Sequence, residues 1–582
     1  MRLSAGLRAL PCLAVASAFA VAPTPVIALQ QADTPAVEAA STPEGVPGGV
    51  LALLANGVAT GGLRENEREA LKAFYARGDA AMVWTDAQGL TATAKAAIAE
   101  IRRADEFGLD PSAFKLPDAL GPTPSPEALA KAEMQLSRAV LIYARHAGGG
   151  RVAPGKVGHQ LVDAPALPEP AAVLEAVSSS DDMVAYLRSL HPSHPQFEAL
   201  REKLAELRGD REQGSRVKLP DGPVLRQGMA GARVVTLRKR LGVTGGEGAK
   251  GEQFDDAVTA AVKKFQRENG LTADGVVGAG TRRALNKGTS ETKILKLLVN
   301  MERWRWLADD LDGDAGIYVW ANIPEFRVRI VKGDKVVFKE RVIVGKTNKQ
   351  TPVFSDEMEW IEFHPTWYVP NSIKKEDILP SLRRPTSKVM ERYHLRLNCG
   401  RHGRDPKMID WNTVDIRNCS ISQPPGQRSV LGDFKFKFPN KHAVYMHDTP
   451  TKGLFNRQTR TFSHGCVRIR NPRRMAEILL EHDKGLTSTR VGQILAGPRS
   501  LHKEDLNRNV PVHITYFTML FDADGTLVNS ADYYGHDRRL AQALTGKGHL
   551  LPVVAAPARR KRPPRRRETS VDRWSEQSFS LN

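Results

Sequence analysis

Apolar residues recur at helical spacing through residues 61–215. Leu71, Phe74 and Tyr75 follow the i, i+3, i+4 pattern of an amphipathic helix, and the same spacing recurs in residues 136–143. Clusters of Pro and Gly separate these helices from one another. The pattern predicts a helical scaffold domain over residues 61–215, and no constellation of catalytic residue types is visible in it.

Three shorter amphipathic stretches follow in residues 220–287. Leu237 lies on the apolar side of the first stretch and Val262 on that of the second. Thr281 has the residue type and the position to N-cap the last stretch. These features predict a small module of three helices.

Beyond Trp306 the apolar positions alternate with a period of two, which is typical of β-strands. A mostly β domain is therefore expected over residues 300–545. The whole chain is expected to be a multidomain α+β protein, with the helical scaffold first, the three-helix module second and the β domain last. The expected strands cover residues 317–320, 326–330, 335–338 and 341–344, with a final strand at 512–517.

The two ends of the chain have different characters. Basic residues precede an apolar run at residues 10–22, and small-residue sites follow it, so residues 1–28 are expected to be a secretory signal peptide. Residues 29–60 are expected to be a linker and residues 546–582 a basic, disordered tail. No second apolar run reaches the length of about 20 residues that spans a bilayer.

Composition narrows the class of protein. The chain of 582 residues is 41% apolar and 26% charged, which excludes collagen, a wholly disordered chain and a multi-span membrane protein. The 84 basic and 65 acidic residues give a formal net charge of +19. This charge favours an anionic partner such as cell wall, membrane surface or nucleic acid, without choosing among them.

The residues that carry chemistry lie in two motifs, H-D-T-P at residues 447–450 and S-H-G-C-V-R at residues 463–468. A cysteine beside two histidines and an arginine has electropositive surroundings, which lower the pKa of a thiol. Cys466 is therefore a candidate nucleophile, and His447 a candidate general base. The amides of Gly465 and Cys466 are candidate donors to a developing oxyanion.

These two motifs together resemble the signature of the L,D-transpeptidase catalytic domain. Residues 365–373, residues 431–440 and the segment 150–152 resemble the large periplasmic members of that family. The F-Q-x-x-x-G-L and D-G-x-x-G elements in residues 265–278 resemble a peptidoglycan-binding module.

The resemblance implies a role for each residue of the site. Cys466 would be the nucleophile and His447 the base, with the carbonyl of Asp448 holding the tautomer of His447. A lid insertion is expected over residues 367–427. Ser463, His464, Gly465 and Arg468 would shape and frame the site, and Trp367, Tyr368 and Tyr445 would contact the substrate.

The resemblance also implies the reaction. Cys466 would attack the carbonyl between the third residue of a peptidoglycan tetrapeptide stem and its terminal D-Ala, release D-Ala and form a thioester. An amine of a second stem would resolve the thioester into a 3→3 cross-link. The family requires no metal and no organic cofactor, acts on peptidoglycan stems and glycan in the periplasm, and is acylated by carbapenems. No nucleic acid is expected as a partner.

Other functions stay open at this point. With water in place of the amine the chain would be an L,D-carboxypeptidase, and with a lipoprotein as acceptor it would attach that lipoprotein to the wall. The non-enzyme alternative is a wall-binding protein with a decayed catalytic domain. That alternative predicts loss of Cys466 or His447, and both residues are present.

Two other sets of residues in the sequence could indicate a different chemistry, a zinc site or a phosphatase. His442, His447, His464 and Cys466 are possible zinc ligands, but neither an H-E-x-x-H motif nor a two-histidine-carboxylate spacing is present. Residues 521–527 contain the D-x-D-G-T motif of aspartate-nucleophile phosphatases. Too little chain follows them for the rest of such a domain, so a hairpin turn is the better interpretation.

The four cysteines are interpreted one by one. Cys12 lies in the expected signal peptide and Cys466 is the candidate nucleophile, which leaves Cys399 and Cys419. Export to an oxidising compartment favours a disulfide between them. We expect this bridge to stiffen the lid, because the segment between the two cysteines has little continuous apolar content to bury free thiols.

Overall fold

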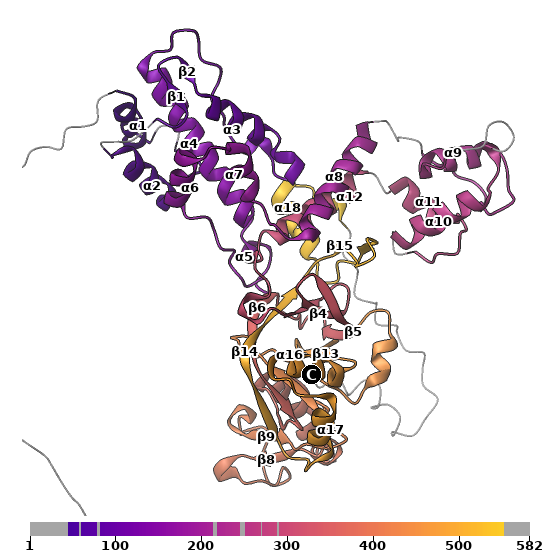
Figure 1. Cartoon of the computed structure of the whole chain (residues 1–582). Helices are drawn as coiled ribbons and strands as arrows, with labels where there is room; N and C mark the ends of the chain where they lie inside the picture. Colours follow the sequence, from indigo (N-terminus) through magenta and orange to yellow (C-terminus); the bar gives the residue numbers. More distant parts are fainter. Residues whose placement is uncertain are drawn as a thin grey trace, which may run out of the picture. The chain divides into compact units, whose positions relative to one another are not determined.

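The computed structural model describes residues 45–57, 60–77, 82–212, 218–244, 251–268, 271–287 and 290–551 (Figure 1). The predicted signal peptide lies outside the described residues, as do most of the predicted linker and most of the basic tail. Within the described ranges, no helix is both long enough and apolar enough to cross a bilayer.

Helix α4 is the centre of the scaffold, and α1, α3 and α6 contact it. Ser125 begins α4 by accepting a hydrogen bond from the Ala128 N–H at 3.3 Å, and Pro126 occupies the first turn. The scaffold elements are α1 (Val46–Ala55), α2 (Glu65–Tyr75), β1 (Thr85–Asp86), β2 (Gly89–Leu90), α3 (Ala92–Arg102), α4 (Pro126–Gly149), α5 (Pro154–Val157), α6 (Pro170–Ser179), α7 (Met183–Ser189) and α8 (Pro195–Glu212).

Both predicted terminal boundaries need correction. Residues 46–55 of the predicted linker form α1, whose Val50 and Leu54 are buried in the scaffold core. These residues are four apart and so lie on one helix face, a signal that the surrounding Gly and Pro obscured. At the other end, Leu551 is buried beside α18, so the fold extends beyond the predicted limit of residue 545.

The small module contains three helices, as predicted: α9 (Ala232–Leu241), α10 (Asp256–Glu268) and α11 (Ala279–Lys287). Leu237 and Val262 lie in its hydrophobic core. Thr281 is not an N-cap, because α11 begins two residues before it. Its hydroxyl instead accepts a hydrogen bond from Gln266 Nε2 at 3.1 Å and connects α11 to α10.

A nine-stranded sheet is the frame of the C-terminal domain. The strand order is β12-β5-β13-β11-β10-β6-β14-β3-β4, and β4 also pairs with β5, so the sheet closes on itself. The predicted strands 335–338 and 341–344 are one strand, β5, because its first part pairs with β4 and its end pairs with β13. The strands are β3 (Tyr318–Asn322), β4 (Arg327–Lys332), β5 (Lys335–Gly345), β6 (Phe354–Phe363), β10 (Phe434–Lys437), β11 (Met446–His447), β12 (Thr461–Ser463), β13 (Val467–Ile469) and β14 (His502–Thr515).

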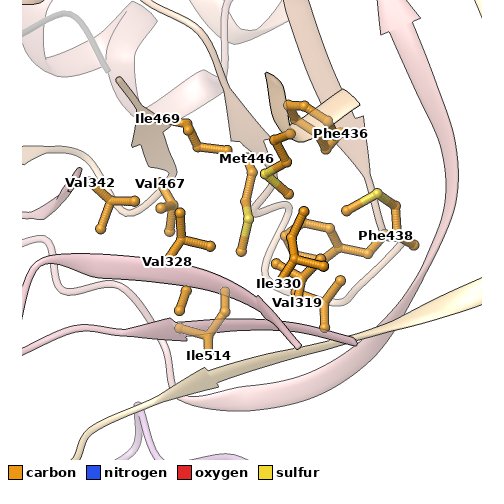
Figure 2. Packing of buried hydrophobic residues seen from close by; sticks show 14 of the residues in the cluster. Val319, Val328, Ile330, Val342, Phe436, Phe438, Met446, Val467, Ile469 and Ile514 are labelled. Atoms are coloured by element: carbon orange, nitrogen blue, oxygen red, sulfur yellow. The ribbon is translucent and has the colours of Figure 1, made fainter. Parts of the chain in front are cut away.

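The core of this domain lies inside the curved sheet. Figure 2 shows Val328, Val342, Met446, Val467 and neighbouring apolar side chains packed against one another. Met475 and Leu479 of α16 join the same cluster. The remaining elements are α12 (Ser290–Trp304), α16 (Pro472–Lys484), α17 (Ser488–Ala496), β15 (Met519–Phe521), β16 (Leu527–Asn529) and α18 (His536–Thr545).

The phosphatase-like motif is a hairpin turn, as predicted. β15 and β16 pair antiparallel on either side of it. The Gly525 N–H donates to the Asp522 carbonyl at 2.9 Å, and the Thr526 N–H donates to the Asp524 carboxylate at 2.9 Å. The acidic residues of the motif therefore shape a turn.

Helices α12 and α18 fasten the end of the scaffold to the β domain. The Glu302 carboxylate accepts hydrogen bonds from the N–H groups of Arg151 at 2.5 Å and Val152 at 2.8 Å. Arg303 and Asp537 form a buried ion pair at 2.6 Å between α12 and α18. α18 also contacts α5.

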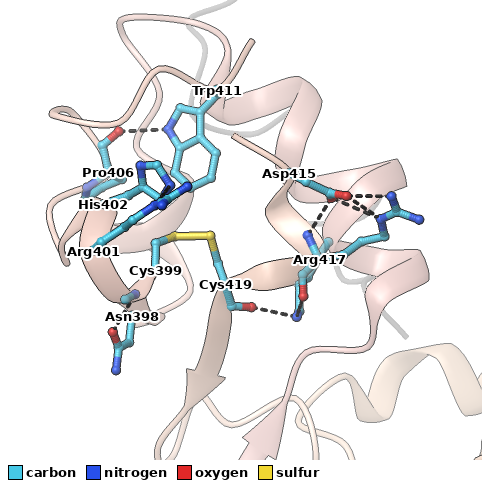
Figure 3. The surroundings of a disulfide bond; sticks show 11 residues. Asn398, Cys399, Arg401, His402, Pro406, Trp411, Asp415, Arg417 and Cys419 are labelled. Atoms are coloured by element: carbon cyan, nitrogen blue, oxygen red, sulfur yellow. Dashed lines mark hydrogen bonds and ion pairs between the residues drawn. A yellow bond between two sulfur atoms is a disulfide. The ribbon is translucent and has the colours of Figure 1, made fainter. Parts of the chain in front are cut away.

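The lid has a small fold of its own. Its strands β7 (Trp367–Tyr368), β9 (Ser420–Gln423) and β8 (Arg396–Asn398) form one sheet in that order. Cys399 and Cys419 form a disulfide with a Cα–Cα distance of 4.1 Å (Figure 3). Both cysteines are buried with Ile409, Trp411 and Ile416 of the segment between them, so the expectation that this segment would not bury them is wrong. The lid helices are α13 (Asn371–Ile373), a π-helical turn (Lys374–Ile378), α14 (Leu379–Leu382) and α15 (Val389–Arg392).

Candidate active site

The two sequence motifs lie on adjacent strands. β11 and β13 are parallel neighbours, with Met446 opposite Val467 and His447 opposite Arg468. Met446 and Val467 point into the hydrophobic core (Figure 2). Because side chains alternate between the two faces of a strand, His447, Cys466 and Arg468 share the opposite face. The fold therefore brings the candidate nucleophile and the candidate base to one face of the sheet.

His447 is held in one tautomer. Its Nδ1 donates to the carbonyl oxygen of Asp448 at 2.5 Å, which is the contact that the resemblance implies. Nε2 is buried and has no hydrogen-bond partner among the described residues. Burial and the charge of Arg468 hold the pKa of His447 well below its ordinary value, so the imidazole is neutral at pH 7. A neutral imidazole with an unprotonated Nε2 is able to accept a proton.

The Asp448 carboxylate fixes the loop that carries this histidine. It accepts hydrogen bonds from the N–H groups of Asp433 at 3.0 Å and Thr449 at 2.6 Å, and it pairs with Lys452 Nζ at 2.5 Å. Gly432 packs directly against this carboxylate, because a Cβ at residue 432 would lie 2.2 Å from Asp448 Oδ2. The side chain of Asp448 is structural, while its carbonyl positions the base.

Burial raises the pKa of the Cys466 thiol. Hydrogen bonds from the main-chain N–H and hydroxyl of Tyr445 and the charges of Arg468 and Lys435 act in the opposite direction. The expectation of a lowered thiol pKa is therefore wrong, because desolvation of the thiolate outweighs its basic surroundings. A protonated thiol at neutral pH makes a neighbouring base necessary for attack.

The turn before Cys466 is stabilised by hydrogen bonds between its own polar groups. Ser463 Oγ donates to the Cys466 carbonyl at 2.6 Å and accepts from the Gly465 N–H at 3.2 Å. Thr351 Oγ1 donates to the Gly465 carbonyl at 2.7 Å. Since Ser463 already engages the Gly465 amide, the assignment of that amide as an oxyanion donor is wrong for this conformation. The assignment of the Cys466 amide stays a prediction.

Comparison with known proteins identifies the domains. Residues 316–491 match the family model of the L,D-transpeptidase catalytic domain. Residues 316–491 are thus similar to an L,D-transpeptidase catalytic domain. Residues 69–204 match the model of a scaffold domain, and residues 230–285 match the model described as "Putative peptidoglycan binding domain".

A curated protein of Haemophilus influenzae, named "Putative L,D-transpeptidase", is 33% identical over 246 residues, which are 42% of this chain and 48% of that protein. The chain therefore spans about half the length of this curated relative. An L,D-transpeptidase structure from Xylanimonas cellulosilytica is 16% identical, with a TM-score of 0.15, and the match covers 51% of this chain and 99% of that one. One from Stackebrandtia nassauensis is 15% identical, with a TM-score of 0.17, and the match covers 50% and 94%. These two TM-scores are too low for either structure to carry an argument.

Of the three residues expected to bind substrate, Tyr445 lies beside the candidate base and the candidate nucleophile. Its ring centroid is 5.5 Å from that of His447, and it hydrogen-bonds to Cys466. Trp367 is only 1% exposed in the lid core, whereas Tyr368 is 70% exposed on the lid. The contact of each with substrate stays a prediction.

Two carboxylates of the lid lie at or near residues 463–466, which we call the catalytic loop because it carries the candidate nucleophile. Asp377 Oδ2 lies 3.3 Å from His464 Nε2. Glu376 Oε1 lies 2.6 Å from Lys349 Nζ in the loop that packs against Gly465. His464 therefore lies against the lid in this conformation, and its expected orienting role in the site stays a prediction.

Lys437 is a residue of the site that sequence analysis missed. Phe434 and Phe436 of β10 face the core, so Lys435 and Lys437 face the side of the transpeptidase sheet that carries His447. Lys437 Nζ lies 5.8 Å from the ring centroid of Trp360 and 5.7 Å from that of Tyr445. Burial lowers the pKa of Lys437, while the charge of Cys466 acts to raise it. The alternation F-K-F-K was the available signal.

No group of three or more His, Cys, Asp or Glu side chains in the described part of the chain is arranged to hold a metal ion. The four possible zinc ligands are thus not gathered into one cluster. His442 instead packs near Phe354, with ring centroids 5.2 Å apart.

Proposed function

We propose that the chain is a peptidoglycan L,D-transpeptidase that forms 3→3 cross-links through a thioester on Cys466. The observation that supports this function most is the shared sheet face of Cys466 and His447, with the imidazole tautomer fixed by Asp448. The matched catalytic domain supports the same reaction class.

The first half-reaction forms the thioester. His447 Nε2 accepts the proton of the Cys466 thiol as the sulfur attacks the carbonyl carbon between the third stem residue and D-Ala. The imidazolium then gives this proton to the leaving nitrogen. D-Ala departs with its free amine, and the acyl group stays on the sulfur.

The second half-reaction transfers the acyl group. A neutral amine of a second stem attacks the thioester carbon and forms the new amide. His447 accepts the proton that the amine loses and returns it to the Cys466 sulfur, which leaves as the thiol. Arg468 stays charged at neutral pH, because burial lowers its pKa only to about 10, and its charge favours the thiolate at both stages.

In this proposal the other domains hold the catalytic domain close to the cell wall. The module matched at residues 230–285 binds wall polymer and raises the local concentration of stems. The chain acts in the periplasm, an oxidising compartment, which agrees with the Cys399–Cys419 disulfide in the lid.

Mass analysis of muropeptides tests the proposal. Purified protein is incubated with tetrapeptide-stem muropeptides, and dimers together with free D-Ala are the expected products. Trimmed tripeptides without dimers would make the chain an L,D-carboxypeptidase. A chain that gives neither product, and that no carbapenem acylates, would be a non-catalytic wall-binding protein.

The identity of the nucleophile is tested separately. A carbapenem should add one adduct to the wild-type protein and none to Cys466→Ala. Intact-protein mass spectrometry counts the adducts. An adduct retained by Cys466→Ala would refute the assignment of the nucleophile.

A further inference from the structure

A cavity of about 670 Å³ lies beside the catalytic loop. Its wall includes His464 and Gly465 of that loop, Lys349 of the preceding turn and His442 before β11. Residues from outside the matched catalytic domain complete the wall, among them Gln160 of the scaffold and Arg539 of α18. The cavity is therefore built jointly by three regions of the chain.

The scaffold part of the wall is held in place by backbone pairing. The Val353 N–H donates to the Gln160 carbonyl at 2.7 Å, and the Val162 N–H donates to the Val353 carbonyl at 3.1 Å. Arg539 Nε donates to the Val157 carbonyl at 2.7 Å and ties α18 to the same segment. These bonds hold the scaffold segment and α18 in place at the wall of the cavity.

The charged side chains of the cavity wall are basic. The described residues that line it include Lys349 and Arg539, and none of them is Asp or Glu. Four histidines add polar groups, and burial lowers the pKa of His442 and His536, so these two imidazoles are neutral at pH 7. The lid carboxylate of Glu376 pairs with Lys349, and that of Asp377 lies beside His464. One basic group of the wall therefore already has a carboxylate partner.

The histidines of the wall have unused hydrogen-bonding atoms. Nε2 of His442, Nδ1 of His464 and Nε2 of His536 are buried and have no hydrogen-bond partner among the described residues. His536 is only 1% exposed, so its Nε2 is shielded from bulk solvent. Buried polar atoms are normally paired, and three such atoms around one cavity indicate a polar ligand.

We propose that this cavity binds a carboxylate-bearing part of the second peptide stem, the one that supplies the amine. This inference rests on the proposed function, which requires a second stem next to the thioester. Arg539 and Lys349 attract the stem carboxylates, and the imidazoles of His442 and His536 hydrogen-bond to its polar groups. Because Gly465 belongs to the wall, a stem bound here lies next to the loop that carries Cys466.

The first test measures binding without chemistry. The probe is a soluble stem tripeptide that ends in diaminopimelate, titrated by calorimetry into the full chain carrying Cys466→Ala. Adding Arg539→Gln should weaken binding about 10-fold, the loss typical of one charge-assisted hydrogen bond. The matched control is Arg538→Gln, a neighbouring exposed arginine that does not line the cavity. Equal affinities for the Arg539 and Arg538 variants would overturn the inference.

The second test measures how much of the thioester reacts with an amine and how much with water. Arg539→Gln also loses a hydrogen bond to the Val157 carbonyl, so His442→Phe is tested beside it as a variant outside α18. Both should lower the ratio of dimers to hydrolysed tripeptides about 10-fold. D-Ala release without acceptor is measured in each variant, and the ratio is corrected for any loss of thioester formation. An unchanged corrected ratio would contradict the inference. A wild-type protein that releases no D-Ala contradicts the proposed function instead.

Discussion

His447 donates its Nδ1 proton to the main-chain carbonyl of Asp448, the residue that follows it. A main-chain acceptor is not removed by any substitution of Asp448. The geometry of the base therefore depends on the loop conformation, which the Asp448 carboxylate fixes through Asp433, Thr449 and Lys452. Substitutions near that carboxylate should therefore shift His447 while leaving the residue itself in place.

Gly432→Ala should impair acylation by displacing this loop. A Cβ at residue 432 would lie 2.2 Å from Asp448 Oδ2, and the φ of +60° disfavours a side chain there. We expect the carbapenem acylation rate to fall about 10²- to 10⁴-fold, the effect of losing a general base. The control Gly453→Ala should acylate normally, because a Cβ at Gly453 meets no atom within 4 Å. Equal rates for the two variants would show that the loop does not position His447.

Alkylation of Cys466 should report its raised pKa. Burial favours the thiol over the thiolate, so the iodoacetamide rate should keep rising with pH beyond about 8.5, the ordinary thiol pKa. Tyr445→Phe removes a hydrogen bond that favours the thiolate. Its rate should therefore be several-fold lower at every pH below the plateau.

The exposed residue Tyr368 supplies the control for this measurement. Tyr368→Phe should alkylate like the wild-type protein, since its side chain is 70% exposed on the lid. The rates are followed by intact-protein mass spectrometry from pH 6 to 10. A wild-type rate that levels off below pH 8 would mean that the basic residues outweigh burial.

Lys437→Met should slow acylation without unfolding the protein. Lys437 is half-buried beside Cys466 between the rings of Trp360 and Tyr445, and its charge favours the thiolate. Loss of that charge should reduce the acylation rate about 3- to 10-fold, while Lys437→Arg should retain most of it. Lys335→Met, at an exposed position of β5, is the control for removing one positive charge. Equal acylation by the Lys437→Met and Lys335→Met proteins would exclude a role for Lys437.

Local patterns in the sequence predicted the parts of the site that are close in the chain. The H-D-T-P and S-H-G-C-V-R motifs indicated His447 and Cys466, and two short strands bring them to one face. The sequence also predicted the three helices of the module and the hairpin between β15 and β16. In each case the interactions that form the structure are between residues close in the sequence or between neighbouring strands.

Features that depend on long-range packing were not predicted. The pKa of Cys466 is set by burial, which neighbouring residues in the sequence do not reveal. Lys437 enters the site only because β10 lies beside β11. Arg539 reaches the cavity because α18 packs on α5 of the scaffold, and nothing local to residue 539 indicates that contact.

The disulfide should stabilise the lid without being needed for chemistry. Cys399 and Cys419 are 20 residues apart, and closing a loop of that size restricts the unfolded chain by about 3 kcal/mol in the entropy model. The Cys419 carbonyl also accepts a hydrogen bond from Lys374 Nζ at 2.7 Å. The bridge therefore holds the start of β9 next to the helical turn that contains Lys374. The bridge thus connects β8, β9 and the helix that contacts the catalytic loop.

Hydrogen exchange measures this effect locally. In the double variant Cys399→Ala, Cys419→Ala, amides of residues 396–423 should exchange roughly 100-fold faster, the equivalent of about 3 kcal/mol, because the lid opens more often. Amides of β6 and β14 should be unaffected, since they belong to the closed sheet rather than to the lid. Cys466→Ala is the matched control, because it removes a cysteine and leaves the bridge intact. Lid exchange equal in the double variant and this control would mean that the apolar core around Ile378 and Trp411 holds the lid without the disulfide.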